Sequence, residues 1–379
     1  MDSEPSETAA SPQREPRGGT AALSRRHSLA LLGGTAAALS LGRALPTRAA
    51  APARTTARSL PTLPRKRGLR LACISDLNGP YGTTGYIPTV HRAVAMIPEL
   101  DVDLVLCAGD MVAGQKRGLG RTRVAAMWAG FERDVLSPLR RRGLPFLPAM
   151  GNHDASSLRS GGGWLFPDDR AEALRFWSAR RDALGLTYLE SSTFPFAYGV
   201  RHGDLAVLVW DASSAGLPDG QAAWANRMLT RGEARSARTR LVMGHLPLHA
   251  VARGRDRDGE VLHGGPSLLA MLESSGAQAY ISGHHHAWYP ARAGGLDLLH
   301  LGAAGNGPRR LLGTSAAGRH TLTVIDLVDG RPLPTTIDLS TGRVIGLNGL
   351  PPSLTDRNGS RLQRWRADHQ LRSRLSTLM

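Results

Sequence analysis

Aspartate, asparagine and histidine recur along this chain in five short blocks, and these side chains are common ligands of divalent and trivalent metal ions. A carboxylate can hold two ions with its two oxygens, a role that neutral histidine and asparagine rarely fill. Two ions about 3.5–4 Å apart clamp a phosphate group and lower the pKa of bound water. The residue types therefore predict a dinuclear centre that hydrolyses phosphate esters, with Mn, Fe or Zn as the favoured ions. The blocks are Asp76-Leu77-Asn78, Gly109-Asp110, Gly151-Asn152-His153-Asp154, Gly244-His245 and Gly283-His284-His285-His286.

Each block comes directly after a short apolar run that is typical of a buried strand. In open α/β sheets the site lies beyond the carboxyl ends of the strands, so residues that follow parallel strands meet along one edge. A single Gly-His-x-His block is weak evidence, because histidine clusters also occur on solvated loops. Five strands ending in ligands within one chain are strong evidence. The runs cover residues 69–75, 102–108, 145–150, 240–243 and 277–282.

The five blocks together resemble those of the calcineurin-like metallophosphoesterase superfamily. The resemblance runs from about Leu69 to His286, and the strands up to about Leu327 fit as the second sheet of that fold. It implies an α/β fold, namely a four-layer αββα sandwich of two mixed β-sheets flanked by helices. A dinuclear metal centre is expected at the rim of this sandwich.

The resemblance also divides the metal ligands into two groups around one shared carboxylate, that of Asp110. The ligands it implies are Asp76 and His286 for the first ion, and Asn152, His245 and His284 for the second. His153 would face the substrate as a catalytic residue that protonates the leaving oxygen or stabilises the phosphoryl charge. Asp154 would hydrogen-bond His153 and fix its orientation.

One position departs from the pattern of the superfamily. The first block usually reads Asp-x-His, and here the third residue is Asn78. Either Asn78 binds the first ion through its amide oxygen, or Tyr81 or Tyr86 in the following loop completes that site. Loop packing is the favoured role of both tyrosines. The departure concerns the identity and affinity of the first ion more than the fold.

Composition bounds the class of protein and its partners. The chain has 379 residues, is 41% hydrophobic and carries a formal net charge of +16, so it can bury a sizeable core and favours anionic partners. No stripe of alternating basic and aromatic residues suggests a nucleic-acid surface, so a small phosphorylated substrate is expected. Two alternatives stay open: a catalytically silent domain that binds a phosphorylated ligand, and a nuclease of the same fold.

The ends of the chain are predicted to lie outside the catalytic domain. Arg25-Arg26 precedes a short, weakly hydrophobic segment, so residues 1–50 resemble a twin-arginine signal that exports folded proteins to the periplasm or beyond. No stable membrane anchor is expected. Residues 51–67 are predicted as a linker, 68–350 as the metallophosphoesterase domain, and 351–379 as a basic, helical tail. The two cysteines, Cys73 and Cys107, are expected to be buried free thiols.

Overall fold

The structure, a computed structural model, describes residues 60–305 and 307–365. The predicted export signal and residues 51–59 of the predicted linker lie outside the described residues, as does the tail from residue 366. Within the described ranges, no helix is long and apolar enough to cross a membrane.

The first sheet has six strands in the order β15-β14-β13-β1-β2-β3. Strands β1, β2 and β3 are parallel and almost wholly buried, so their carboxyl ends face the same edge. Strand β13 pairs antiparallel with the other side of β1, which makes the sheet mixed. The strands are β1 (Arg70–Ile74), β2 (Leu104–Cys107), β3 (Phe146–Pro148), β13 (Thr321–Val328), β14 (Arg331–Asp338) and β15 (Arg343–Ile345).

The second sheet has nine strands in the order β16-β17-β11-β12-β10-β9-β8-β7-β6. Its centre, β8-β9-β10-β12, is parallel, and antiparallel strands extend it on both sides. A separate hairpin joins β4 (Arg159–Ser160) to β5 (Gly163–Trp164). The strands of the large sheet are β6 (Thr187–Thr193), β7 (Ala197–His202), β8 (Leu205–Val209), β9 (Thr239–Met243), β10 (Ala279–Ser282), β11 (Tyr289–Ala293), β12 (Leu296–His300), β16 (Ser353–Thr355) and β17 (Arg361–Arg364).

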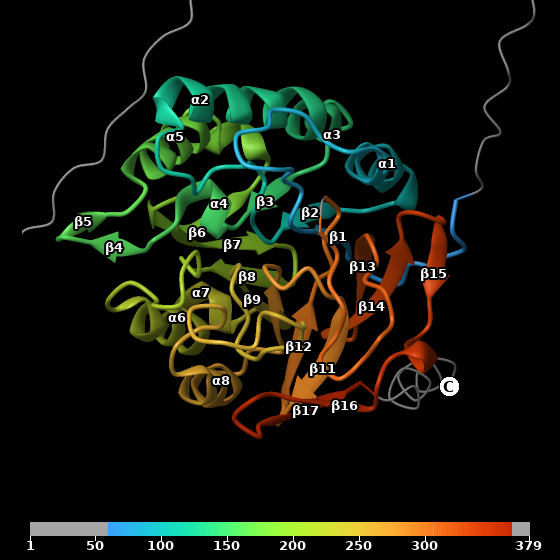
Figure 1. The fold of residues 1–379 in the computed structure, drawn as a ribbon. Helices are drawn as coiled ribbons and strands as arrows, with labels where there is room; N and C mark the ends of the chain where they lie inside the picture. Colours follow the sequence, from blue (N-terminus) through green and yellow to red (C-terminus); the bar gives the residue numbers. More distant parts are fainter. Residues whose placement is uncertain (1–59, 306, 366–379) are drawn as a thin grey trace, which may run out of the picture. The chain divides into compact units, whose positions relative to one another are not determined.

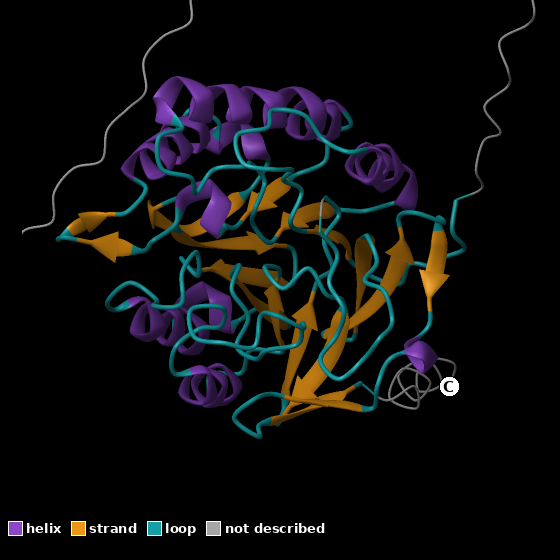
Figure 2. Ribbon diagram, viewed as in Figure 1, coloured by secondary structure: helices purple, strands orange, loops and turns teal. Residues whose placement is uncertain are grey.

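Helices cover the outer face of each sheet, so the predicted four-layer αββα sandwich is confirmed (Figures 1 and 2). On β8, Val207 faces the core between the sheets, and the next residue, Leu208, faces the core under the helices. Helices α1 (Pro88–Met96), α2 (Gly120–Phe131), α3 (Ser137–Arg141) and α5 (Pro167–Ser178) lie on the first sheet, and α6 (Gln221–Thr230), α7 (Gly232–Arg235) and α8 (Gly265–Ser274) on the second. The short helices are α4 (Asn152–Ala155), η1 (Ile97–Leu100), η2 (Glu132–Leu136), η3 (Arg181–Leu184) and η4 (Leu347–Gly349).

An aromatic cluster fixes α2 and α5 on β3, the strand that leads to Asn152. Trp128 of α2 stacks on Phe176 of α5 with ring centroids 4.7 Å apart, and Trp177 stacks on Phe146 of β3 at 6.1 Å. Each such pair contributes about 0.5–1.5 kcal/mol beyond its buried area. The base of the ligand-bearing loop is therefore rigid.

Cys73 and Cys107 are buried free thiols, as predicted. They lie on neighbouring strands, but Cys107 pairs with Ile74 rather than with Cys73. Successive side chains of a strand point to opposite faces, so the two thiols face opposite sides of the sheet.

The tail prediction is wrong where the structure describes the tail. Residues 353–355 and 361–364 form strands instead of a helix, and β17 pairs with β11, so the second sheet continues beyond residue 350. Pairing with an available edge strand outweighs local helical spacing, because Leu362 gains burial in the core beneath it.

The strands after the last ligand block also divide differently from the prediction. Strands β11 and β12 join the second sheet, whereas β13 returns to pair with β1 in the first. This pairing covers the open edge of β1 and buries almost all of β13.

Candidate metal centre

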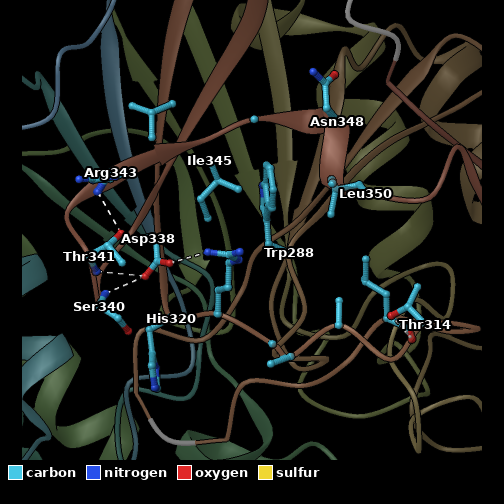
Figure 3. Close-up of a pocket in the computed structure, with 18 of the residues that line it drawn as sticks. Trp288, Thr314, His320, Asp338, Ser340, Thr341, Arg343, Ile345, Asn348 and Leu350 are labelled. Atoms are coloured by element: carbon cyan, nitrogen blue, oxygen red, sulfur yellow. Dashed lines mark hydrogen bonds and ion pairs between the residues drawn. The ribbon is translucent and has the colours of Figure 1, made fainter.

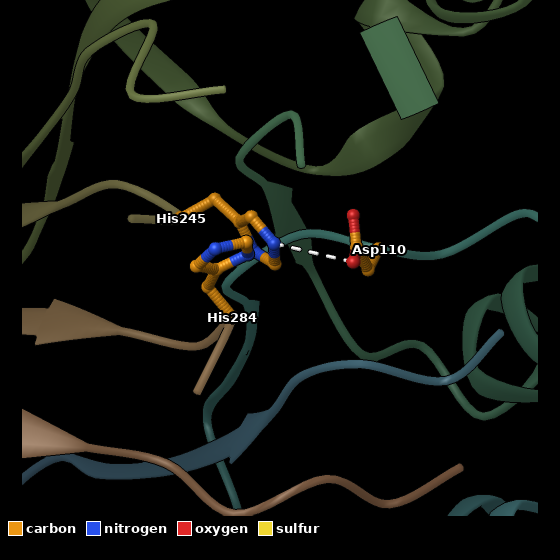
Figure 4. Close-up of side chains that lie close together, drawn as sticks. All are labelled: Asp110, His245 and His284. Carbon is orange, nitrogen blue, oxygen red and sulfur yellow. Dashed lines mark ion pairs between the residues drawn. The ribbon is translucent and has the colours of Figure 1, made fainter. Parts of the chain in front are cut away.

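The five predicted ligand blocks follow β1, β2, β3, β9 and β10, and the structure brings them together at one rim of the sandwich. Two overlapping clusters have ligand atoms within 4.8 Å of one another: Asp110, His245 and His284, and Asp76, Asp110 and His286. Figure 4 shows the first cluster, with both imidazoles beside the Asp110 carboxylate. Because Asp110 belongs to both clusters, one carboxylate lies between two candidate ion sites.

The predicted ligands of the second ion converge closely. Oδ1 of Asn152 lies 3.0 Å from Nε2 of His245 and 2.9 Å from Nδ1 of His284. The same His245 nitrogen lies 3.2 Å from Oδ2 of Asp110. An amide oxygen, two imidazole nitrogens and a carboxylate oxygen form a donor set that suits Mn, Fe or Zn. These four residues therefore fit one ion.

The predicted ligands of the first ion are fewer. Nε2 of His286 lies 3.1 Å from Oδ1 of Asp76, whose two oxygens both accept from the backbone N–H of His284. Asn78 is buried beside them, and its backbone N–H donates to the carbonyl oxygen of Asp110 over 3.1 Å. Coordination by the Asn78 carboxamide stays a prediction.

The two tyrosines of the following loop have other contacts. The Tyr86 hydroxyl donates to the carbonyl oxygen of Met111 over 2.7 Å, which is the packing role favoured from the sequence. Tyr81 is exposed, and its ring lies 5.3 Å from that of His153. Tyr81 therefore lies beside the predicted catalytic histidine.

The backbone at the ligands adopts a conformation that most side chains avoid. Asp76, Asp110, His284 and His286 have φ values of 54°, 55°, 63° and 52°. Left-handed residues other than glycine each cost roughly 1–3 kcal/mol and cluster at functional sites. A Cβ on Gly151 would lie 2.2 Å from Oδ1 of Asp110, so only glycine permits this approach. The strained backbone conformation at these four residues therefore positions their side chains at the rim.

Backbone carbonyls orient two of the histidines. Nδ1 of His245 lies 2.7 Å from the carbonyl oxygen of Ala108, and Nδ1 of His286 lies 2.9 Å from that of Gly307. A carbonyl oxygen only accepts, so each Nδ1 carries the proton and each Nε2 is directed to the cluster. This arrangement fixes the tautomer that a metal ligand requires.

Two side chains that the sequence did not single out support the second ion site. Nε2 of His284 donates to Oε2 of Glu260 over 2.8 Å, which leaves Nδ1 for the ion. The amide nitrogen of Asn152 donates to Oε1 of Gln115 over 2.5 Å, which turns its oxygen to the cluster. Both lie in long rim loops whose sequence has no periodic signal, so only the folded chain identifies them.

His153 and Asp154 are both at the rim, but they do not form the expected pair. Nδ1 of His153 contacts the carbonyl oxygen of Gly114 at 3.0 Å, and its Nε2 lies 4.0 Å from Oδ2 of Asp110. The carboxylate of Asp154 accepts from the backbone N–H groups of Met111, Val112 and Gly151. The expected hydrogen bond is therefore wrong, because consecutive residues of the turn α4 point about 100° apart. Asp154 instead joins the loops after β2 and β3.

Electrostatics at the rim favour a bound cation. Burial opposes the charge on Asp110, but His245 and His153 outweigh it and hold the pKa of Asp110 well below its usual range. Burial would likewise lower the pKa of His245, but Asp110 and Asp76 raise it to about 9. Burial lowers the pKa of His284 to about 4, which keeps this imidazole neutral and able to bind metal.

The family model of the calcineurin-like phosphoesterases (Metallophos) matches residues 69–288, more than half of the chain. This chain belongs to the calcineurin-like phosphoesterase family. No curated protein matches its sequence. Among solved structures, the fold is similar to a purple acid phosphatase from yellow lupin (Lupinus luteus) seeds, with 12% identity and a TM-score of 0.54. That match covers 76% of this chain and 54% of the lupin chain, so this chain spans about half of the lupin protein's length. A dimetal phosphatase from Danio rerio is 15% identical over 70% of this chain and 98% of its own, with a TM-score of 0.46.

Beyond the candidate metal ligands, the chain has a cavity of about 820 Å³ between residues 309–320 and the segment from β14 to η4 (Figure 3). Trp288, two residues after His286, lies across it, with Ile345 and Leu350 nearby. Arg309, whose backbone N–H donates to the carbonyl oxygen of His286, also lines it. The cavity holds none of the metal-ligand clusters found in the described residues.

Proposed function

We propose that this protein is a metal-dependent phosphoesterase that hydrolyses phosphomonoesters or phosphodiesters at a dinuclear centre. One observation carries the proposal: the Asp110 carboxylate is common to two clusters of candidate ligands, of which only His286 is not fully buried. A carboxylate shared in this way is the arrangement that two neighbouring ions require. Two ions bound here would polarise the phosphoryl oxygens and lower the pKa of the attacking water.

The chain's own residues supply the remaining chemistry. His153 has 17% of its side chain exposed, and its Nδ1 is held by Gly114. Its Nε2 lies 4.0 Å from Oδ2 of Asp110, so a proton at this atom could pass to the leaving oxygen of a substrate at the centre. The ring of Tyr81 lies at a tilt beside that of His153, with the centroids 5.3 Å apart.

Two other functions remain alternatives to this one. A silent phospho-ligand-binding domain would keep the fold without turnover, yet the ligand set and His153 are complete apart from the change at Asn78. A nuclease would prefer polynucleotides to small esters. A substrate panel separates the three functions.

The test uses the chain from residue 51 onward, with metal content measured by mass spectrometry. We expect two ions per chain and hydrolysis of phenyl phosphate or bis(4-nitrophenyl) phosphate. His245→Ala removes a ligand of the second ion, so we expect it to abolish most of the hydrolysis. His91→Ala, an exposed histidine on α1, is the matched control. Wild-type protein that binds phosphate but hydrolyses no ester would support the silent-domain alternative.

We also propose that the folded protein is exported by the twin-arginine route. The proposal rests on Arg25-Arg26 and the weakly hydrophobic segment that follows. Replacing Arg25 and Arg26 by lysine should retain the protein in the cytoplasm, as measured by cell fractionation. Normal export of the double variant would contradict it.

A further inference from the structure

Two arginines lie against the two histidines of the last ligand block. Nη1 of Arg255 lies 3.3 Å from Nε2 of His284. The backbone N–H of Arg309 donates to the carbonyl oxygen of His286 over 2.9 Å. Because His284 and His286 belong to different ion sites, the arginines border both halves of the candidate metal centre.

The loops that carry these arginines are joined side by side. The backbone N–H of Arg253 donates to the carbonyl oxygen of Arg310 over 2.8 Å, and Ala252 and Leu311 form a β-bridge. A Cβ placed on Gly254 would lie 4.0 Å from Nη1 of Arg309. The guanidinium of Arg309 therefore extends toward the loop that carries Arg255.

Positive charge at this point exceeds the negative charge that faces it. Glu260 accepts from Arg255 and Arg257 and also binds His284, so one carboxylate serves several donors. Within the described residues, Nε of Arg255 and Nε of Arg309 are buried without a hydrogen-bond partner. Burial and the neighbouring Arg255 lower the pKa of Arg309, and Glu260 and Asp76 offset this effect only in part.

We propose that Arg255 and Arg309 bind a second anionic group of the substrate, next to the phosphate that is hydrolysed. Guanidinium groups with free N–H donors match phosphate and carboxylate oxygens. The substrate class is therefore a phosphate ester that carries another phosphate or a carboxylate near the scissile bond. Since Arg309 also lines the cavity of Figure 3, such a substrate extends from the metal centre toward that cavity. The inference rests on the proposed phosphoesterase function and deepens it.

Binding provides the first test, without turnover. The full chain loaded with Mn²⁺ is titrated calorimetrically with inorganic phosphate and with methylenediphosphonate. The second compound is an analogue of diphosphate whose P–C–P bridge is not hydrolysed. We expect the diphosphonate to bind the wild type at least about tenfold more tightly, since charge-assisted hydrogen bonds are roughly twice as strong as neutral ones. Arg309→Gln should remove this preference, and Arg309→Lys should retain part of it. Arg310→Gln, the exposed neighbour, is the matched control and should keep the preference.

Turnover provides the second test and separates carboxylate from phosphate as the second group. We expect the wild type to have a lower KM for 4-carboxyphenyl phosphate than for phenyl phosphate if a carboxylate is accepted. Arg309→Gln should raise the first KM more than the second, with a smaller change in kcat. Wild type that hydrolyses phenyl phosphate without preference for either doubly anionic probe overturns this proposal alone. Equal losses in Arg309→Gln and Arg310→Gln overturn it too, whereas an absence of any hydrolysis overturns the proposed function as well.

Discussion

Asp110, at the carboxyl end of β2, and Asp297, at the start of β12, are both acidic side chains removed from most of the solvent. Asp110 is 1% exposed and accepts from the backbone N–H of His153 over 2.9 Å. The side chain of Asp297 is 13% exposed, and its nearest cation, Nη1 of Arg292, lies 3.5 Å away. The partners of Asp110 hold its pKa well below the usual range, whereas burial raises the pKa of Asp297 to about 7.

The difference shows that burial alone does not make a metal ligand. Desolvation raises the pKa of any carboxyl group, and only charges or donors placed within a few ångströms reverse that effect. At the rim, imidazoles and backbone donors keep the carboxylates ionised. Beside Asp297, a cavity of about 370 Å³ admits solvent but gives Oδ1 no hydrogen bond within the described chain. Removal of the charge should therefore weaken metal binding at Asp110, whereas at Asp297 it should stabilise the folded protein.

The largest effect is expected from Asp110→Asn, which keeps the shape of the side chain but removes its charge. Both ions should bind more weakly or be lost, and hydrolysis of phenyl phosphate should fall roughly 10³-fold. Metal content by mass spectrometry and steady-state rates measure this. Asp204→Asn, on a side chain that is 77% exposed, should change neither. Retention of two ions and of the wild-type rate in Asp110→Asn would show that the carboxylate is not shared.

Glu260→Gln should weaken the binding of the second ion and leave the affinity for the first ion unchanged. The carboxylate that accepts from His284 increases the basicity of that ligand, and loss of such a partner typically costs about 10–100-fold in metal affinity. Stepwise metal titration resolves the two ions. The matched control is Asp258→Asn, in the same loop and 86% exposed. Equal weakening of both ions would contradict the division into two half-sites.

Asn78→His addresses the half-site with fewer ligands. An imidazole binds Mn, Fe or Zn better than an amide oxygen does, so the first ion should bind about tenfold more tightly. The same titration measures the gain, and Asn226→His on the exposed side of α6 is the control. Unchanged affinity of both ions would show that residue 78 does not reach the first ion.

The ends of the strands were predictable because the signal is local. An apolar run, a glycine and a polar ligand are adjacent in the sequence, and parallel pairing carries Asp76, Asp110 and Asn152 to one edge without further information. β17 was not predictable, since Arg361–Arg364 becomes a strand only by pairing with β11. The return of β13 to β1 likewise depends on which edge is open after the rest has folded.

Within the site, the convergence of the predicted ligands could be inferred from the sequence, whereas the side chains that support them could not. Glu260 and Gln115 reach His284 and Asn152 from loops whose path depends on many contacts rather than on spacing. The prediction for Asp154 failed because adjacency in sequence was taken as adjacency in space. In the turn α4, its carboxylate points to backbone N–H groups instead of the His153 ring.

Asp297→Asn should have the smallest effect on function, with activity unchanged and stability altered only above a pH of about 4. The folded pKa of about 7 exceeds the unfolded value of 3.8, so the charged carboxylate destabilises the folded state. The folded state of the wild type is therefore most stable below a pH of about 4, and this contribution of Asp297 is lost as the pH rises through about 7. The free energy of unfolding of the variant, measured in urea, should exceed that of wild type by at most about 4 kcal/mol at pH 8, the equivalent of the rise in pKa from 3.8 to about 7. The difference should shrink toward pH 4, where the wild-type side chain is protonated in both states. A difference that does not change with pH would mean that Asp297 is already paired, and the contrast with Asp110 would then be wrong.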